Sequence, residues 1–89
     1  MDSRTILATN IKYYRLKYNL SQERLAEICN CSLVYINQVE NGDRNVSIDI
    51  LDKLKDGLNK EFNLDLTSSE LLKYDESHIT NYSRIDEKK

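Results

Sequence analysis

The side chains with recognisable binding chemistry are concentrated in residues 32–45, which read SLVYINQVENGDRN. If residues 33–41 form a helix, with about 100° of turn per residue, Val34 and Gln38 project from one side and Asn37 lies beside them. Gln and Asn can form two hydrogen bonds with an adenine edge, and an apolar side chain can pack on a thymine methyl group. These residue types at this spacing therefore predict a surface that reads base edges.

Groups suited to phosphate oxygens surround this predicted face. Gln22 lies at the expected start of an earlier helix, and Asn41 and Arg44 follow the reading residues. Amide and guanidinium N–H groups are common donors to a nucleic-acid backbone. The face could also be ordinary surface, with Leu33 half buried against the preceding helix and Val34 a single exposed apolar residue of the kind common in proteins.

The charge distribution restricts where an anionic partner could bind. The whole chain has a net charge of −2 and a pI of about 5.3, which counts against indiscriminate nucleic-acid binding. Residues 1–60 carry nine basic and eight acidic side chains, whereas residues 61–89 carry four basic and seven acidic ones. Any anionic partner is therefore expected on the first part.

The titratable and soft side chains offer little for catalysis or metal binding. The chain has one histidine, His78, and two cysteines, Cys29 and Cys31, so one chain lacks the ligands for a closed four-ligand metal site. Neither a Gly-rich phosphate loop nor a carboxylate pair with a plausible pocket is recognisable. We therefore expect no enzyme, cofactor, metal or small-molecule effector site, and both cysteines as small apolar core residues.

Length and hydropathy favour a small binding module. At 89 residues the chain is expected to form one small domain without a deep substrate cleft. No apolar run approaches the roughly 20 residues of a membrane-spanning helix, and the first residues, MDSRTILATN, lack the order of a signal peptide. We therefore expect a cytoplasmic protein with no membrane partner.

Helices must position these residues. The sequence has no proline, only two glycines and no sustained alternation of β-branched residues, which predicts an all-α bundle of about five short helices. Caps and apolar spacing place these helices at residues 3–18, at 22–29, at 33–41, after Ser47 and after Thr67. From Ser77 onward the polar sequence is expected to be a fraying tail.

The second and third expected helices are short and are joined by about three residues. Small Ala26 lies where they would have to cross closely, and Asn30 suits a left-handed turn. This is the spacing of a helix-turn-helix, which places its second helix in the major groove of DNA.

The run from Arg15 to Leu58 resembles the helix-turn-helix DNA-binding domain of the phage repressor and Cro type, a lambda-repressor-like fold. The matching sequences are LSQERLAEICNCS and YINQVENGDRNVS, followed by leucines spaced L-x-x-L-x-x-x-L. The resemblance implies double-stranded DNA as partner, phosphate contacts by Gln22 and Asn41, and an internal ion pair between Arg15 and Glu40. Left single, either buried charge would cost several kcal/mol.

The segment Y-I-x-x-V-E-N-G-x-R-N-x-S is similar to the controller proteins of restriction-modification systems, which are short and act as dimers on paired operator half-sites. The similarity implies backbone or minor-groove contacts by Tyr35, Arg44 and Asn45. The chain departs from the family pattern where Asn30 replaces the usual turn glycine and where apolar residues replace the polar pair at positions 33 and 34. The expected DNA-facing set is Gln22, Ser32, Leu33, Val34, Tyr35, Asn37, Gln38, Asn41, Arg44 and Asn45.

These observations predict a homodimeric, sequence-specific regulator of transcription on a palindromic operator. We expect a DNA-binding domain at residues 1–66, followed at 67–89 by a short helix and tail that could mediate dimerisation. Apolar residues beyond Leu58 exceed what the core needs and form the expected dimer surface, although they could instead cover the base of that core: Phe62, Leu64, Leu66, Leu71 and Leu72.

A different class of function is also open. The acidic C-terminal part could bind a protein, as in a toxin-neutralising antitoxin, with the helix-turn-helix serving only autoregulation. An adjacent toxin gene would favour that alternative, and a neighbouring methyltransferase or endonuclease gene would favour the controller protein.

Overall fold

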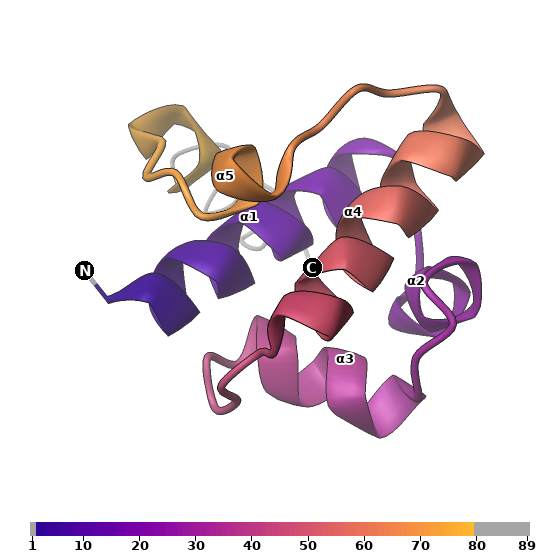
Figure 1. The fold of residues 1–89 in the computed structure, drawn as a ribbon, viewed down its shortest axis with the longest axis horizontal. Helices are drawn as coiled ribbons and strands as arrows, with labels where there is room; N and C mark the ends of the chain where they lie inside the picture. The colour runs from indigo at the N-terminus through magenta and orange to yellow at the C-terminus, as the bar shows by residue number, and fades with distance from the viewer. Residues whose placement is uncertain (1, 80–89) are drawn as a thin grey trace.

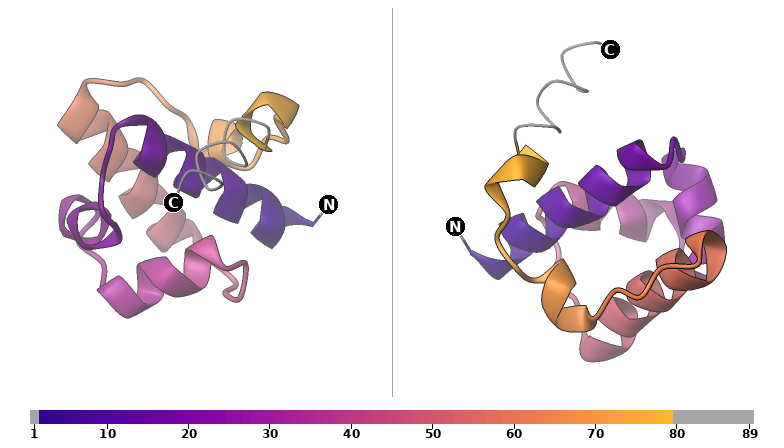
Figure 2. Two further views of the ribbon diagram at one scale, coloured as in Figure 1. Left: turned by 180° about the vertical axis from the view of Figure 1, so that it is seen from behind. Right: turned by 90° about the horizontal axis from the view of Figure 1, so that it is seen from above.

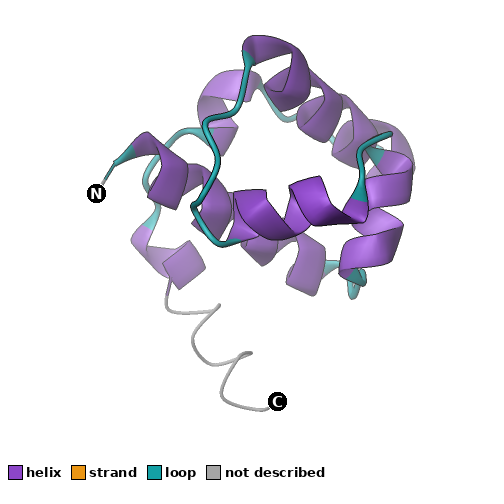
Figure 3. Ribbon diagram, turned by 90° about the horizontal axis from the view of Figure 1, so that it is seen from below, coloured by secondary structure: helices purple, strands orange, loops and turns teal. Residues whose placement is uncertain are grey.

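The computed structural model describes residues 2–79 of the chain, and in this part the regular structure is entirely helical (Figures 1 and 3). The prediction of an all-α bundle is confirmed. Each of the first three helices ends one residue before its predicted end, because that last residue is the cap. The helices are α1 (Ser3–Lys17), α2 (Gln22–Ile28), α3 (Leu33–Glu40), α4 (Ile48–Phe62) and α5 (Ser68–Leu71), and residues 76–79 are also helical.

Side-chain caps fix where the helices begin. Ser21, Ser32 and Ser47 each accept a hydrogen bond from the backbone N–H three residues on, as their sequence positions predicted. Thr67 and Glu70 form the predicted capping box at α5. Asp2 caps α1 with its carboxylate, which accepts a hydrogen bond from the backbone N–H of Thr5. Each cap satisfies an N–H group that the first helical turn would otherwise leave unpaired.

Positive backbone dihedrals mark the ends of the connections. Asn30, in the turn between α2 and α3, has φ 53°, as predicted for a left-handed turn residue. Asn19, Asn63 and Gly42 have φ values of 57°, 54° and 73° after α1, α4 and α3. In the described residues, asparagine therefore occupies most of the left-handed positions at helix ends, where glycine is the commonest residue in proteins.

One core joins all five helices. α3 packs on α1 and α2, α4 packs on α2, and α5 packs on both α1 and α4 (Figure 2). Where α4 passes the end of α2, a Cβ at Gly57 would lie only 2.6 Å from the carbonyl oxygen of Ile28, so this approach requires glycine. The fully buried large side chains are Ile11, Leu25, Ile36, Leu54, Leu58 and Leu71.

The segment after α5 is held against α1 by a buried polar cluster that the sequence did not suggest. Asn10 donates both N–H groups of its side-chain amide, to the carbonyl oxygens of Leu71 at 2.7 Å and Lys73 at 2.9 Å. Its Oδ1 must then accept from Nδ1–H of His78, at 2.8 Å. The His78 ring also stacks on Tyr13, with 3.8 Å between centroids.

The expectation of a fraying tail from Ser77 onward is therefore wrong for the described residues. Residues 76–79 are helical, and His78 is buried with a hydrogen-bond partner and an aromatic partner on α1. The rest of the predicted tail, residues 80–89, lies outside the described part. α5 supplies Leu71 to the common core, so α5 and α1 to α4 form one packed unit. Among the described residues, no helix is both long and apolar enough to cross a membrane.

Candidate nucleic-acid interface

α2, a four-residue turn and α3 form the helix-turn-helix unit. The turn brings the backbone N–H of Cys31 within 2.9 Å of the carbonyl oxygen of Ala26, and Ala26 is buried between the helices. Cys29 packs in the core, where burial raises the pKa of its thiol to about 12, so the thiol stays protonated and unreactive. Within residues 2–79, no group of three His, Cys, Asp or Glu side chains could hold a metal ion.

α3 has a buried inner side and an exposed outer side, and it runs along the lower edge of the molecule in Figure 1. Ile36, Val39 and Glu40 are buried, as the helical wheel predicted. Val34 is 67% exposed and Leu33 is 43% exposed, so neither belongs to the core. Two apolar side chains thus lie in water at the start of α3, which is the part of a recognition helix that reaches the bases.

A buried ion pair fastens α3 to α1. Arg15 donates from Nε to Oε2 of Glu40 at 2.7 Å and from Nη2 to Oε1 at 3.1 Å, and its Nη1 donates to the carbonyl oxygen of Leu20 at 2.9 Å. Both side chains are almost completely buried. The structure thus brings together the two residues that the family resemblance pairs, in a two-point geometry that holds both helices in one orientation.

Three amide side chains are linked across the exposed side of α2 and α3. Gln22 donates from Nε2 to Oε1 of Glu40 at 3.1 Å and accepts at Oε1 from Nδ2 of Asn37 at 3.4 Å. Asn37 in turn accepts at Oδ1 from Nδ2 of Asn41 at 3.1 Å. The sequence predicted each of these residues at the interface but gave no sign that they bond to one another.

Arg44 lies back over α3. Its guanidinium carbon is 4.5 Å from the centroid of the Tyr35 ring, a cation–π arrangement, and its Nη1 donates to Oε1 of Gln38 at 3.1 Å. Asn45 is exposed in the loop that follows, and Ser32 caps α3 with its hydroxyl. Basic and amide donors therefore flank the exposed residues of α3 on both sides.

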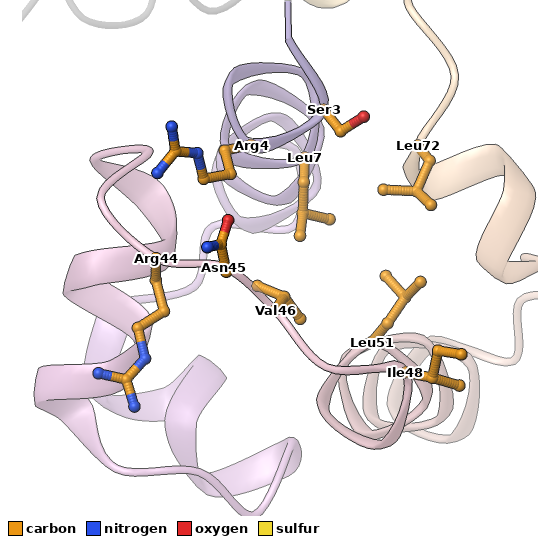
Figure 4. Close-up of a pocket in the computed structure, with 9 residues that line it drawn as sticks. All are labelled: Ser3, Arg4, Leu7, Arg44, Asn45, Val46, Ile48, Leu51 and Leu72. Atoms are coloured by element: carbon orange, nitrogen blue, oxygen red, sulfur yellow. The ribbon is translucent and has the colours of Figure 1, made fainter.

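A surface cavity of about 240 Å³ lies between the start of α1, the loop before α4 and the residue after α5. Figure 4 shows Leu7, Val46, Leu51 and Leu72 turned toward this space, with the guanidinium groups of the lining arginines directed away. Carboxylate and imidazole groups are missing from the cavity lining, so it has no pair of groups suited to general acid–base chemistry.

The five residues expected to form a dimer surface lie in different environments. Leu71 is fully buried in the core of its own chain and is therefore unavailable to a partner. Phe62 stacks on Tyr18 with 4.2 Å between ring centroids, while Leu64 and Leu66 are half buried. Leu72 is 41% exposed at the cavity of Figure 4.

Sequence reasoning missed Ile48, which lines the same cavity and is 78% exposed. Its position directly after the Ser47 cap was the available signal, because the first residues of a helix have no preceding turn to cover them. Ile48 and Leu72 are thus two exposed apolar residues at one cavity, and we call them the exposed apolar surface.

Comparison with known proteins agrees with this geometry. The family model described as Helix-turn-helix matches residues 11–64. Control protein C.SmaI of Serratia marcescens is 48% identical over 59 residues, covering 66% of this chain and 70% of that protein. Control protein C.BamHI of Bacillus amyloliquefaciens is 39% identical over 56 residues, covering 62% and 69%. The resemblance to controller proteins is thereby confirmed.

The arrangement of the helices also occurs in a solved structure. The crystal structure of the hypothetical transcription factor NHTF from Neisseria superposes with a TM-score of 0.74 at 25% identity, covering 89% of this chain and 84% of that one. The exposed outer side of α3, the matched motif and these relatives agree with one another. The chain belongs to the helix-turn-helix family and is a DNA-binding regulator of transcription.

Proposed function

We propose that the protein acts as a homodimer on a palindromic operator in double-stranded DNA and controls restriction-modification genes. The observation that carries this proposal is the outer side of α3, where Val34 is 67% exposed beside Gln38 while the opposite side is fixed to α1 through the Arg15–Glu40 pair. A rigid helix with exposed apolar and amide side chains suits direct reading of base edges.

The interface residues divide by the part of DNA that each would contact. Val34 packs on a thymine methyl group and Gln38 hydrogen-bonds a base edge, with Leu33 beside them in the groove. Gln22, Ser32 and Asn41 contact the phosphate backbone, and Tyr35, Arg44 and Asn45 contact the backbone or the minor groove. Backbone contacts set the register of the protein on the duplex, whereas the contacts of α3 supply the sequence preference.

Dimerisation adds a second reading helix and so raises the affinity above that of a monomer. Residues 1–60 are nearly neutral, so backbone attraction alone would bind a monomer weakly. To read two half-sites, two copies joined through Ile48 and Leu72 would have to hold their α3 helices about 34 Å apart, which is one turn of the duplex. Leu64, Leu66 and Phe62, which are half buried, could extend this surface at its edge.

Selection of bound sequences from random duplexes tests the proposal. We expect an enriched palindrome whose half-sites are centred about one helical turn apart. Enrichment of an asymmetric site, or no enrichment, would contradict it. The genes beside this one provide a further test: a methyltransferase or endonuclease gene supports the restriction-modification role, and a small toxin gene contradicts it. The proposed role requires that the protein share a compartment with the chromosome, in keeping with the cytoplasmic location expected from the sequence.

A further inference from the structure

Three amide side chains, of the half-buried Gln22 and the exposed Asn37 and Asn41, form one hydrogen-bonded chain that ends on a buried charge. The chain runs from Asn41 to Asn37 at 3.1 Å, from Asn37 to Gln22 at 3.4 Å, and from Gln22 to Glu40 at 3.1 Å. Glu40 is nearly completely buried and is held by Arg15, whereas Asn37 and Asn41 are exposed. The chain therefore connects the interior of the domain to the surface that faces DNA.

The direction of every bond in this chain follows from its buried end. A carboxylate paired with a guanidinium can only accept hydrogen bonds, so Gln22 must turn its NH₂ group toward Glu40 and its oxygen toward Asn37. Asn37 must then donate to that oxygen, which leaves its own oxygen to accept from Asn41. Asparagine and glutamine amides can usually be built in either orientation, but here the fixed charge selects one.

The selected orientation leaves donors at both ends of the reading side. Each NH₂ group has two hydrogens, and Gln22 and Asn41 each use one within the chain. Gln22 is the first residue of α2, and Asn41 is the C-cap of α3. Asn37 lies between them and uses both its NH₂ group and its oxygen to hold them.

We propose that Asn37 is a positioning residue that couples the phosphate contacts of Gln22 and Asn41 and does not read a base. The inference rests on the proposed function and revises the role that the sequence suggested for Asn37. Gln38 keeps its proposed reading role, because its side chain accepts a hydrogen bond from Arg44 and takes no part in the chain of amides. Asn37 and Gln38 are neighbours on α3 and thus have different roles: Asn37 positions other side chains, and Gln38 reads a base.

Binding measurements with Asn37→Ala, and with Gln38→Ala as the matched control, separate these duties. The duplexes are the selected palindrome and all single-base variants of its half-site. We expect N37A to weaken binding to every duplex by the same factor, roughly tenfold, because the amides lose their fixed orientation while every base contact remains. Q38A should change the preference at one position in each half-site. A loss of preference at one position in N37A would overturn the proposal.

A double-mutant cycle tests the coupling itself. Gln22→Ala and Asn41→Ala are each measured in the natural chain and in N37A. We expect Q22A to reduce affinity several-fold in the natural chain and to add little in N37A, and the same for N41A. Additive losses would show three independent contacts and would overturn the proposal.

A folding control excludes a merely structural effect. Asn37 is exposed, so N37A should leave the thermal midpoint of unfolding unchanged, and a fall in that midpoint parallel to the loss of affinity would overturn the proposal. Failure of the proposed function has a different signature. In that case the natural chain enriches no palindrome, and the inference about Asn37 fails with it. If only the inference about Asn37 fails, the natural chain still enriches a palindrome, but N37A does not weaken binding to every duplex by the same factor.

Discussion

At the scale of the residue, the protein uses apolar and amide side chains where a plain surface would carry Lys and Glu. Val34 and Leu33 are exposed at the start of α3, and Gln38 follows one turn later. Exposure of apolar atoms to water is unfavourable by about 25 cal/mol per Å². The proposed contact of Val34 with a thymine methyl group would remove this exposed area and so favour binding.

Val34 provides a test at the level of one methyl group. Deoxyuridine differs from thymidine only by lacking the C5 methyl, so replacing thymine by uracil at the contacted position should weaken binding by about fourfold, the value of one buried methyl. Val34→Ala should reduce this difference. Fluorescence anisotropy with matched duplexes measures it. Equal affinity of the natural chain for both bases at every half-site position would contradict the contact.

The buried ion pair makes a second prediction, on stability. Arg15→Met leaves the Glu40 carboxylate buried without its partner, which should lower the free energy of unfolding by about 3–5 kcal/mol. The double variant R15M/E40L removes both charges and should recover most of this loss. Urea unfolding followed by circular dichroism measures both. If the double variant is no more stable than R15M, the lost free energy of unfolding comes from removing the ion pair itself and not from leaving Glu40 unpaired.

At the scale of the element, the helices could be predicted because their signals are local. Ser21, Ser32, Ser47 and Thr67 act within three residues of themselves, and apolar spacing fixes the buried side of each helix. The placement of the candidate residues on α2 and α3 was also predictable, because it follows from the helix bounds. The pairing of Arg15 with Glu40 came from family resemblance, since local pattern says nothing about partners 25 residues apart.

The bonds within the site and the attachment of the last segment were not predictable. The chain of amides depends on side-chain directions that a helical wheel does not give, and Asn10 meets His78 across 68 residues of sequence. A polar residue on α1 and a histidine in a polar stretch carry no local sign that they will be buried together. Long-range polar pairing therefore marks the limit of reasoning from the sequence.

The contact of His78 with α1 predicts a dependence of stability on pH. Burial, with a smaller effect of Lys17, lowers the pKa of His78 below its ordinary value of 6.5, against the opposing effect of Asp75. As pH falls below 6.5 the unfolded chain takes up the proton first, so the free energy of unfolding should decrease until the pH passes the folded pKa, and should be constant above about pH 7.5. Chemical unfolding from pH 5 to 8 measures this.

His78→Gln is the control for that experiment. Gln can still donate to Oδ1 of Asn10 but does not titrate, and His78 is the only histidine in the chain. The variant should therefore show a flatter profile between pH 5 and 7. Unchanged pH dependence in H78Q would assign the effect to other groups.

At the scale of the whole molecule, the outer side of α3, which we propose reads bases, and the exposed apolar surface belong to different parts of the fold. Val34 lies on α3, whereas Ile48 begins α4 and Leu72 follows α5 (Figures 1 and 4). A partner copy bound at Ile48 and Leu72 would therefore leave Val34 free for DNA. This separation means that the proposed dimerisation and the proposed base reading can be tested one at a time.

Charge substitution tests that separation. Ile48→Glu or Leu72→Glu should convert the dimer to a monomer in analytical ultracentrifugation and greatly weaken binding to the palindrome, because carboxylates would be buried at the contact. Val34→Glu should keep the dimer and lose DNA binding. A dimer that persists in both I48E and L72E would place the contact between copies elsewhere on the surface.

The attachment of Asn10 also has a consequence for synthesis and folding. Its partners at Leu71, Lys73 and His78 lie 61 to 68 residues further along the chain. A growing polypeptide must therefore leave the ribosome almost to the end of the described part before this buried amide is satisfied and Leu71 closes the core. The order of synthesis thus delays completion of the DNA-binding unit, and cutting the gene after residue 66 would leave that unit permanently unfinished.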